Sequence, residues 1–117
     1  MAEDIIDLAD VLERVQDDKE LLLELLDIFQ EDFLVKRQSL AEAVDKGDFV
    51  KIKEAAHSMK GASGNISAKR MHATFLHVEH LSKENSLAGV KDLLKVIDDQ
   101  FEEVKVNTIK LKQQFAG

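Results

Sequence analysis

Apolar residues recur at alternating spacings of three and four along much of the chain, which is the repeat of an amphipathic helix. The longest run covers residues 87–115 and keeps this spacing without a break, as expected for the seam of a helical bundle. Its nine positions are Leu87, Val90, Leu94, Ile97, Phe101, Val104, Thr108, Leu111 and Phe115.

Polar residues that favour helix starts divide the rest of the chain into further helices. Side chains of Asp and Ser at such positions accept hydrogen bonds from first-turn N–H groups. In chain order the expected caps are Asp4, Asp17, Asp48, Ser67 and Ser86. We predict helices over about 4–14, from about 17 to the stop at Gly47, over about 49–64 and over about 68–84, followed by the seam helix.

The predicted helices present apolar stripes that need a common core. The stripe of the third helix is Phe49, Ile52, Ala56, Met59 and Ser63, and that of the fourth is Met71, Phe75, Val78 and Leu81. Short connections between long helices favour antiparallel neighbours. We therefore predict an all-α fold, an antiparallel up-and-down four-helix bundle with an additional short N-terminal helix, and a single domain over residues 1–117.

Composition agrees with this fold and excludes several functions. The 117 residues include no Pro, Trp or Tyr and only five Gly, so little interrupts a helix. Absence of Cys excludes disulfides and cysteine zinc sites. The acidic N-terminus does not resemble a signal peptide, and no apolar run approaches the ~20 residues of a membrane span. We expect a cytoplasmic protein without a membrane partner.

Charge is unevenly distributed along the chain. The net charge of −7 argues against nucleic acid as a partner. The window from Lys51 to His72 nevertheless carries +4, which leaves −11 on the remainder. This window is either an ordinary solvated surface or a positive field suited to a phosphoryl group or a carboxylate-rich partner.

Four residues of the third predicted helix form an unusual face. His57, Lys60, Gly61 and Gly64 stand at positions i, i+3, i+4 and i+7, so a nucleophile, a cation and two positions without side chains lie together. Gly within a helix costs about 0.5–1 kcal/mol relative to Ala. We infer that the active site of another protein approaches His57 closely.

Three of these residues, His57, Lys60 and Gly61, lie within the run Ala56-His57-Ser58-Met59-Lys60-Gly61-Ala62-Ser63, which resembles the signature A-H-x-L-K-G-[SA]-[SA] of histidine-containing phosphotransfer (HPt) domains. Similarity to the family extends over nearly the whole chain. Further matching segments are Asp7-Leu8, Leu12-Glu13-Arg14-Val15, Gly47-Asp48, Asn65-Ile66, Met71 and Val78-Glu79. Ser67 departs from the family, which usually has Gly in the turn before the fourth helix.

The resemblance implies a carrier in a multistep His–Asp phosphorelay. His57 would accept a phosphoryl group on Nε2 from a receiver phospho-aspartate and pass it to another receiver Asp. Expected partners are response-regulator receiver domains or a hybrid histidine kinase. The receiver would supply the catalytic carboxylates and Mg²⁺, so we expect no enzyme activity, no intrinsic cofactor and no metal site. The chain contains no nucleotide-binding glycine motif, and a monomer is expected.

The same resemblance suggests supporting roles for neighbouring residues. Lys60 would neutralise phosphoryl oxygens, and Gly61 would leave room for the receiver. Gly64 serves either the same surface or close helix packing. Glu79 either accepts a hydrogen bond from the ring Nδ1–H or forms an exposed pair with Lys83, which itself matches a basic position beside the histidine in some members.

Other functions are consistent with parts of the pattern. One alternative is the phosphorylatable domain of a chemotaxis-type kinase, and another is a helical interaction module with an unmodified His57. The remaining histidines, His72, His77 and His80, are expected to be ordinary surface or boundary residues. Ile6, Leu8 and Leu23 are either core residues or candidates for the docking surface of a receiver.

Overall fold

The structure is a computed structural model that describes residues 4–116, and within this range it is all-helical. The prediction of an all-α fold is confirmed. In chain order the helices are α1 (Leu8–Arg14), α2 (Lys19–Asp45), α3 (Phe49–Asn65), α4 (Lys69–Lys83) and α5 (Leu87–Ala116).

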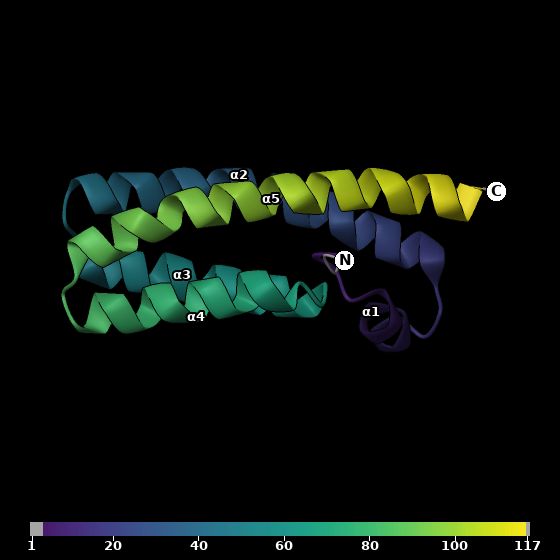
Figure 1. Ribbon diagram of the computed structural model, residues 1–117, viewed down its shortest axis with the longest axis horizontal. Helices are drawn as coiled ribbons and strands as arrows, with labels where there is room; N and C mark the ends of the chain where they lie inside the picture. Colours follow the sequence, from purple (N-terminus) through teal and green to yellow (C-terminus); the bar gives the residue numbers. More distant parts are fainter. Residues whose placement is uncertain (1–3, 117) are drawn as a thin grey trace.

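The four long helices run up and down and close into a bundle (Figure 1). Each packs against the next in sequence, and α5 returns to pack against α2. With 27 and 30 residues, α2 and α5 are much longer than α3 and α4, with 17 and 15. The α2–α5 pair therefore extends beyond α3 and α4, and α1 lies at that end of the bundle (Figure 1). The predicted bundle with an additional short N-terminal helix is confirmed.

The core follows the predicted stripes. On α3, Ile52, Ala56, Met59 and Ser63 are buried, whereas Phe49 is only partly covered. The rings of Phe33 and Phe101 stack between α2 and α5, with centroids 3.8 Å apart. The stacking of these two buried rings adds to the stability that the protein gains by removing apolar surface from water.

Capping at the α2–α3 turn is as predicted. Gly47 has φ +62°, the left-handed conformation that Gly adopts without steric cost, and the Asp48 side chain accepts a hydrogen bond from the Lys51 N–H. The cap predicted at Asp17 is wrong by one residue, because Asp18 caps α2 and Asp17 itself has φ +60°.

The N-terminal helix begins later than predicted, after Asp7 and not after Asp4. Ile5 and Ile6 precede it and are buried, and the Ile6 N–H donates to Asn107 Oδ1 of α5 at 3.2 Å. The segment with these two side chains forms a bend that packs on the bundle and is not part of the helix. Tertiary packing therefore determines the start of α1.

The prediction that Ser67 caps α4 is wrong, because α4 starts after Ala68 without a side-chain cap. Ser67 instead adopts φ +56° in the turn where the family usually has Gly. Its hydroxyl donates to Asp10 Oδ2 at 2.5 Å, and its carbonyl accepts from the Asp7 N–H at 3.0 Å. These bonds tie α1 to the α3–α4 turn and offset the strain of a left-handed residue that is not Gly.

Within residues 4–116, no helix has the length and apolar character needed to cross a bilayer. The predicted single domain includes residues 1–3 and 117, which lie outside the described range.

Candidate functional site

The His57 side chain projects from the outer face of α3. Its neighbours Ala56 and Met59 are buried in the bundle, and this register turns the imidazole outward. The ring is 71% exposed. A nucleophile on a regular helix is thus held in a fixed place while remaining open to another molecule.

A buried carboxylate from α4 lies beneath this ring. Glu79 is only 8% exposed, and its Oε1 lies 3.5 Å from Nδ1 of His57 and 2.8 Å from Nζ of Lys60. The Lys60 ammonium thus forms a close ion pair with this buried oxygen. The structure therefore brings together His57, Lys60 and Glu79, and the exposed pairing of Glu79 with Lys83 is not formed.

Glu79 is ionised at neutral pH. Burial alone would raise its pKa, but the Lys60 ammonium and the His57 ring outweigh this effect, so the pKa is lowered from its ordinary value. The oxygen facing Nδ1 is consequently an anionic acceptor. Such an acceptor favours the tautomer with the proton on Nδ1, which leaves the lone pair on Nε2.

The two glycines of the His57 face have different surroundings. A Cβ added at Gly61 would meet nothing within 4 Å, whereas one at Gly64 would lie 3.2 Å from Nδ1 of His72. Gly64 therefore lies in close contact with α4, which favours the second of the two roles left open by the sequence. Gly61, by contrast, faces open space.

His72 lies at the boundary of the core, one of the two environments expected from the sequence. It is half-buried on α4, and its Nδ1 lies 2.9 Å from the carbonyl oxygen of Lys60. The sequence contained one sign of this position. His72 lies seven residues before Glu79 and therefore on the same face of α4. Lys83, by contrast, is exposed and forms no ion pair within residues 4–116.

Charge around His57 is more balanced than the sequence window implied. Lys60 is paired with Glu79, Lys69 with Asp7 and Arg70 with Glu103. Three of the five basic residues of the window are thus compensated by acids from other helices or from the N-terminal segment. The window as a whole therefore does not carry an uncompensated positive charge, which was one of the two interpretations left open by the sequence.

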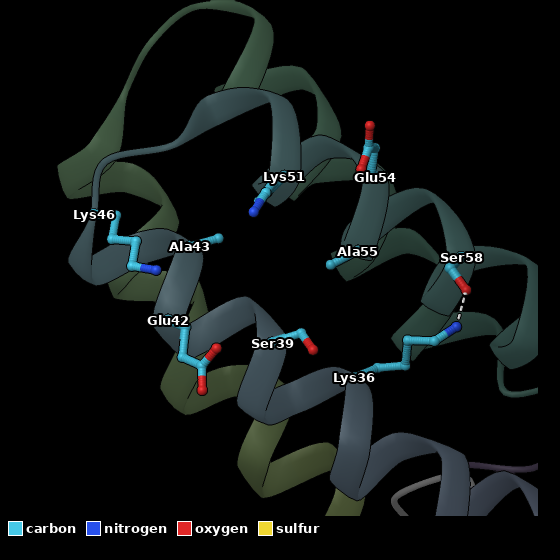
Figure 2. Close-up of a pocket in the computed structure, with 9 residues that line it drawn as sticks. All are labelled: Lys36, Ser39, Glu42, Ala43, Lys46, Lys51, Glu54, Ala55 and Ser58. Atoms are coloured by element: carbon cyan, nitrogen blue, oxygen red, sulfur yellow. Dashed lines mark hydrogen bonds between the residues drawn. The ribbon is translucent and has the colours of Figure 1, made fainter.

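A lysine from outside that window approaches the site from α2. Lys36 donates from Nζ to the hydroxyl of Ser58 at 2.6 Å, directly beside His57 in sequence. The pair lies at one edge of a hollow between α2 and α3 (Figure 2). Ala43 and Ala55 line this hollow, and their small side chains leave it open. Lys36 Nζ also lies 3.9 Å from Oδ1 of Asp32 on its own helix, so its charge, like that of Lys60, already has an acidic partner.

Exposed apolar side chains lie on the α2 side of the site. Ile28 and Val35, two turns apart on α2, are 59% and 65% exposed. Ile28 and Leu25 border a shallow groove whose other wall includes Ala62 of α3, the residue after Gly61. We refer to Leu25, Ile28, Val35 and Ala62 as the α2–α3 apolar surface.

The docking residues predicted from the sequence lie elsewhere. Ile6 is 2% exposed and belongs to the core, one of the two positions left open by the sequence. Leu8 and Leu23 are half-buried and pack against the core. Among residues 4–116, no group of three or more His, Cys, Asp or Glu side chains is arranged to hold a metal ion.

Comparison with known proteins identifies the family. The family model described as Hpt domain matches residues 24–107, which is more than half of the chain and includes the whole His57 site. The protein therefore belongs to the Hpt family, and its role is that of a histidine phosphotransfer carrier in a phosphorelay.

A relative agrees with this assignment, and a solved structure agrees with the fold. The chain is 26% identical over 109 residues to histidine-containing phosphotransfer protein 2 of Arabidopsis thaliana, covering 89% of this chain and 68% of that protein. It is also similar to a crystal structure of histidine-containing phosphotransfer protein B (HptB) from Pseudomonas aeruginosa PAO1, with a TM-score of 0.86 and 24% identity. That match covers 97% of this chain and 98% of the HptB chain, and it concerns the fold.

Proposed function

We propose that His57 is the phosphoryl acceptor of this protein and that Nε2 is the atom modified. The observation that carries the proposal is an exposed imidazole whose Nδ1 faces the buried, ionised carboxylate of Glu79. A neutral ring with its proton on Nδ1 has its lone pair on Nε2, and this lone pair is the nucleophile.

In the forward step, the Nε2 lone pair attacks the phosphorus of a receiver aspartyl phosphate. The N–P bond forms, the P–O bond to the aspartyl oxygen breaks, and the carboxylate leaves with the electron pair. The ring keeps its Nδ1 proton and becomes positively charged. Glu79 would stabilise this charge, as a carboxylate does beside the imidazolium of a catalytic triad.

Lys60 and Gly61 would serve the phosphoryl group itself. The Lys60 ammonium stands one helical turn from His57 and can share its charge between Glu79 and the phosphoryl oxygens. The open space over Gly61 would admit the metal-bearing site of the receiver. The receiver would supply the carboxylates and Mg²⁺, because phosphoryl transfer depends mainly on positioning and charge neutralisation.

The receiver would dock on the α2–α3 apolar surface. This surface adjoins Gly61 through Ala62, and exposed apolar patches beside a reactive group mark protein-binding sites. Lys36 at its edge suits the acidic pocket of a receiver. We propose receiver domains, free or within a hybrid histidine kinase, as partners, with the protein acting as a monomer.

A phosphotransfer assay tests the proposal. Receiver domains encoded in the same genome would be phosphorylated with acetyl phosphate and Mg²⁺ and then mixed with the wild-type protein, His57→Gln or His77→Gln. We expect an acid-labile phosphoryl group on the wild type and on His77→Gln, whose histidine is exposed on α4, but none on His57→Gln. Labelling of another residue, or no transfer from the complete panel, would contradict it.

A further inference from the structure

We propose that His72 is a positioning residue for phosphotransfer, because its ring fixes α4 against the turn of α3 that carries Lys60. This inference rests on the proposed function of His57. Three contacts support it. They are the hydrogen bond from His72 to the Lys60 carbonyl, the packing of the His72 ring against Gly64, and the ion pair of Lys60 with Glu79.

The hydrogen bond determines where His72 carries its proton. A backbone carbonyl oxygen only accepts, so Nδ1 of His72, at 2.9 Å from Lys60 O, must be the donor. The same carbonyl accepts from the N–H four residues on within the helix, and its second lone pair receives the imidazole. His72 therefore joins two helices without breaking the backbone bonds of α3.

Gly64 makes this approach possible. A Cβ at that position would lie 3.2 Å from Nδ1 and 3.7 Å from Cε1 of His72, closer than side chains normally pack. With hydrogen in its place, the imidazole reaches over the helix to the Lys60 carbonyl. The glycine thus serves an internal contact, unlike Gly61, over which space is open.

Lys60 is consequently held by α4 at both ends. His72 binds its backbone carbonyl, and Glu79, seven residues later on the same face of α4, pairs with its ammonium. A lysine side chain loses much rotamer freedom when it is fixed beside a ligand. A fixed register between α3 and α4 keeps the Lys60 ammonium and the Glu79 carboxylate beside His57 before the receiver arrives.

Two substitutions at position 72 separate the hydrogen bond from simple packing. His72→Asn keeps an N–H donor near the position of Nδ1, whereas His72→Leu fills comparable space without a donor. We expect His72→Leu to slow transfer from a saturating phosphorylated receiver by about fivefold, the effect of one such hydrogen bond. His72→Asn should restore most of the rate, and His77→Leu, at an exposed position of the same helix, should leave it unchanged.

A long-range ¹H–¹⁵N spectrum of the histidine rings gives a readout independent of transfer. We expect Nδ1 of His72 to carry a proton, because this atom donates to the Lys60 carbonyl. Absence of a proton from Nδ1, a normal rate for His72→Leu, or equal slowing by Leu and Asn would each overturn the positioning role. A wild-type protein that accepts no phosphoryl group would overturn the proposed function and this role together, whereas loss of Asn rescue alone would leave the proposed function intact.

A double-mutant cycle tests the part played by Gly64. Gly64→Ala should slow transfer in the wild type, because the methyl group displaces the His72 ring, but should have no further effect in His72→Ala. Equal slowing in both backgrounds would mean that Gly64 acts on the incoming receiver, and it would overturn the proposed coupling to His72.

Discussion

Oε1 of Glu79 lies between two cationic or potentially cationic groups, 2.8 Å from Nζ of Lys60 and 3.5 Å from Nδ1 of His57. The distance to the imidazole is long for a hydrogen bond. Such contacts often shorten once the reacting complex forms, and here the ring would gain positive charge as the N–P bond forms. One buried oxygen therefore links the nucleophile to the lysine that would meet the phosphoryl group.

Replacement of this carboxylate by an amide isolates the effect of its charge. Glu79→Gln retains an oxygen acceptor but no longer compensates the positive ring, so we expect the protein to accept a phosphoryl group about tenfold more slowly. Rapid-quench measurement with a phosphorylated receiver gives the rate. Glu84→Gln, at the exposed end of α4, is the matched control, and equal rates for the two variants would argue against a role for the Glu79 charge.

Acid should destabilise the protein partly through Glu79. Because its pKa is lower in the folded state than in the unfolded chain, its contribution to stability is present above the ordinary carboxyl pKa. That contribution is lost as pH falls through the lowered value. Asp7 and Asp10 act in the same direction, since a bond from Lys69 lowers the pKa of Asp7 and a bond from Ser67 lowers that of Asp10.

We therefore expect the free energy of unfolding to decrease from pH 5 to pH 3. Urea titrations at several pH values measure it, and the Glu79→Gln variant should show a smaller decrease because it lacks one of the linked protons. A wild-type stability that stays constant or rises toward pH 3 would be inconsistent with the lowered pKa values.

Gly61 and Gly47 should respond to Ala in opposite ways. Gly61 lies within α3 beside open space, so Gly61→Ala should raise the free energy of unfolding by about 0.5–1 kcal/mol while slowing transfer. Gly47 has φ +62°, so Gly47→Ala should lower it by about 1 kcal/mol without affecting transfer by the folded protein. Urea denaturation and the transfer assay together measure both properties.

A larger side chain extends this test. Gly61→Gln should fold as Gly61→Ala does and slow transfer further, because the added bulk occupies the space required by the receiver. Wild-type transfer by Gly61→Gln would remove the argument that a partner approaches this point closely.

The α2–α3 apolar surface can be tested by placing a charge on it. Ile28→Glu should weaken receiver binding by about tenfold, because it removes a central apolar contact and adds a carboxylate facing an acidic partner. Ile109→Glu on α5 is the matched control, since these two isoleucines are 59% and 58% exposed. Calorimetric titration with a receiver and Mg²⁺ measures the affinity, and equal weakening by both variants would place the docking surface elsewhere.

The periodicity of the sequence was sufficient to predict the bundle and the outward position of His57. Buried residues such as Ile52, Ala56 and Met59 recur at helical spacing, and the orientation of His57 follows directly from them. The turn at Gly47 was predictable for the same reason, because its conformation depends mainly on local backbone sterics.

Features set by contacts between distant segments were not predictable in this way. Helix α1 starts after Asp7 because Ile6 is bound to Asn107, about a hundred residues further along the chain. Burial of Glu79 and the bond from His72 to Lys60 depend on the register of α4 against α3, which the pattern of either helix alone does not specify.

The position of His57 on the outer face of a single helix has a consequence for signalling through the proposed relay. Because a receiver would approach this single imidazole across Gly61, only one receiver could bind at a time. The receiver that donates the phosphoryl group and the receiver that accepts it would then compete for the same binding surface. An excess of either one would block the other. The rate of phosphoryl transfer through the relay would depend on the relative abundance of the two partners. The carrier itself would impose no preferred direction of transfer.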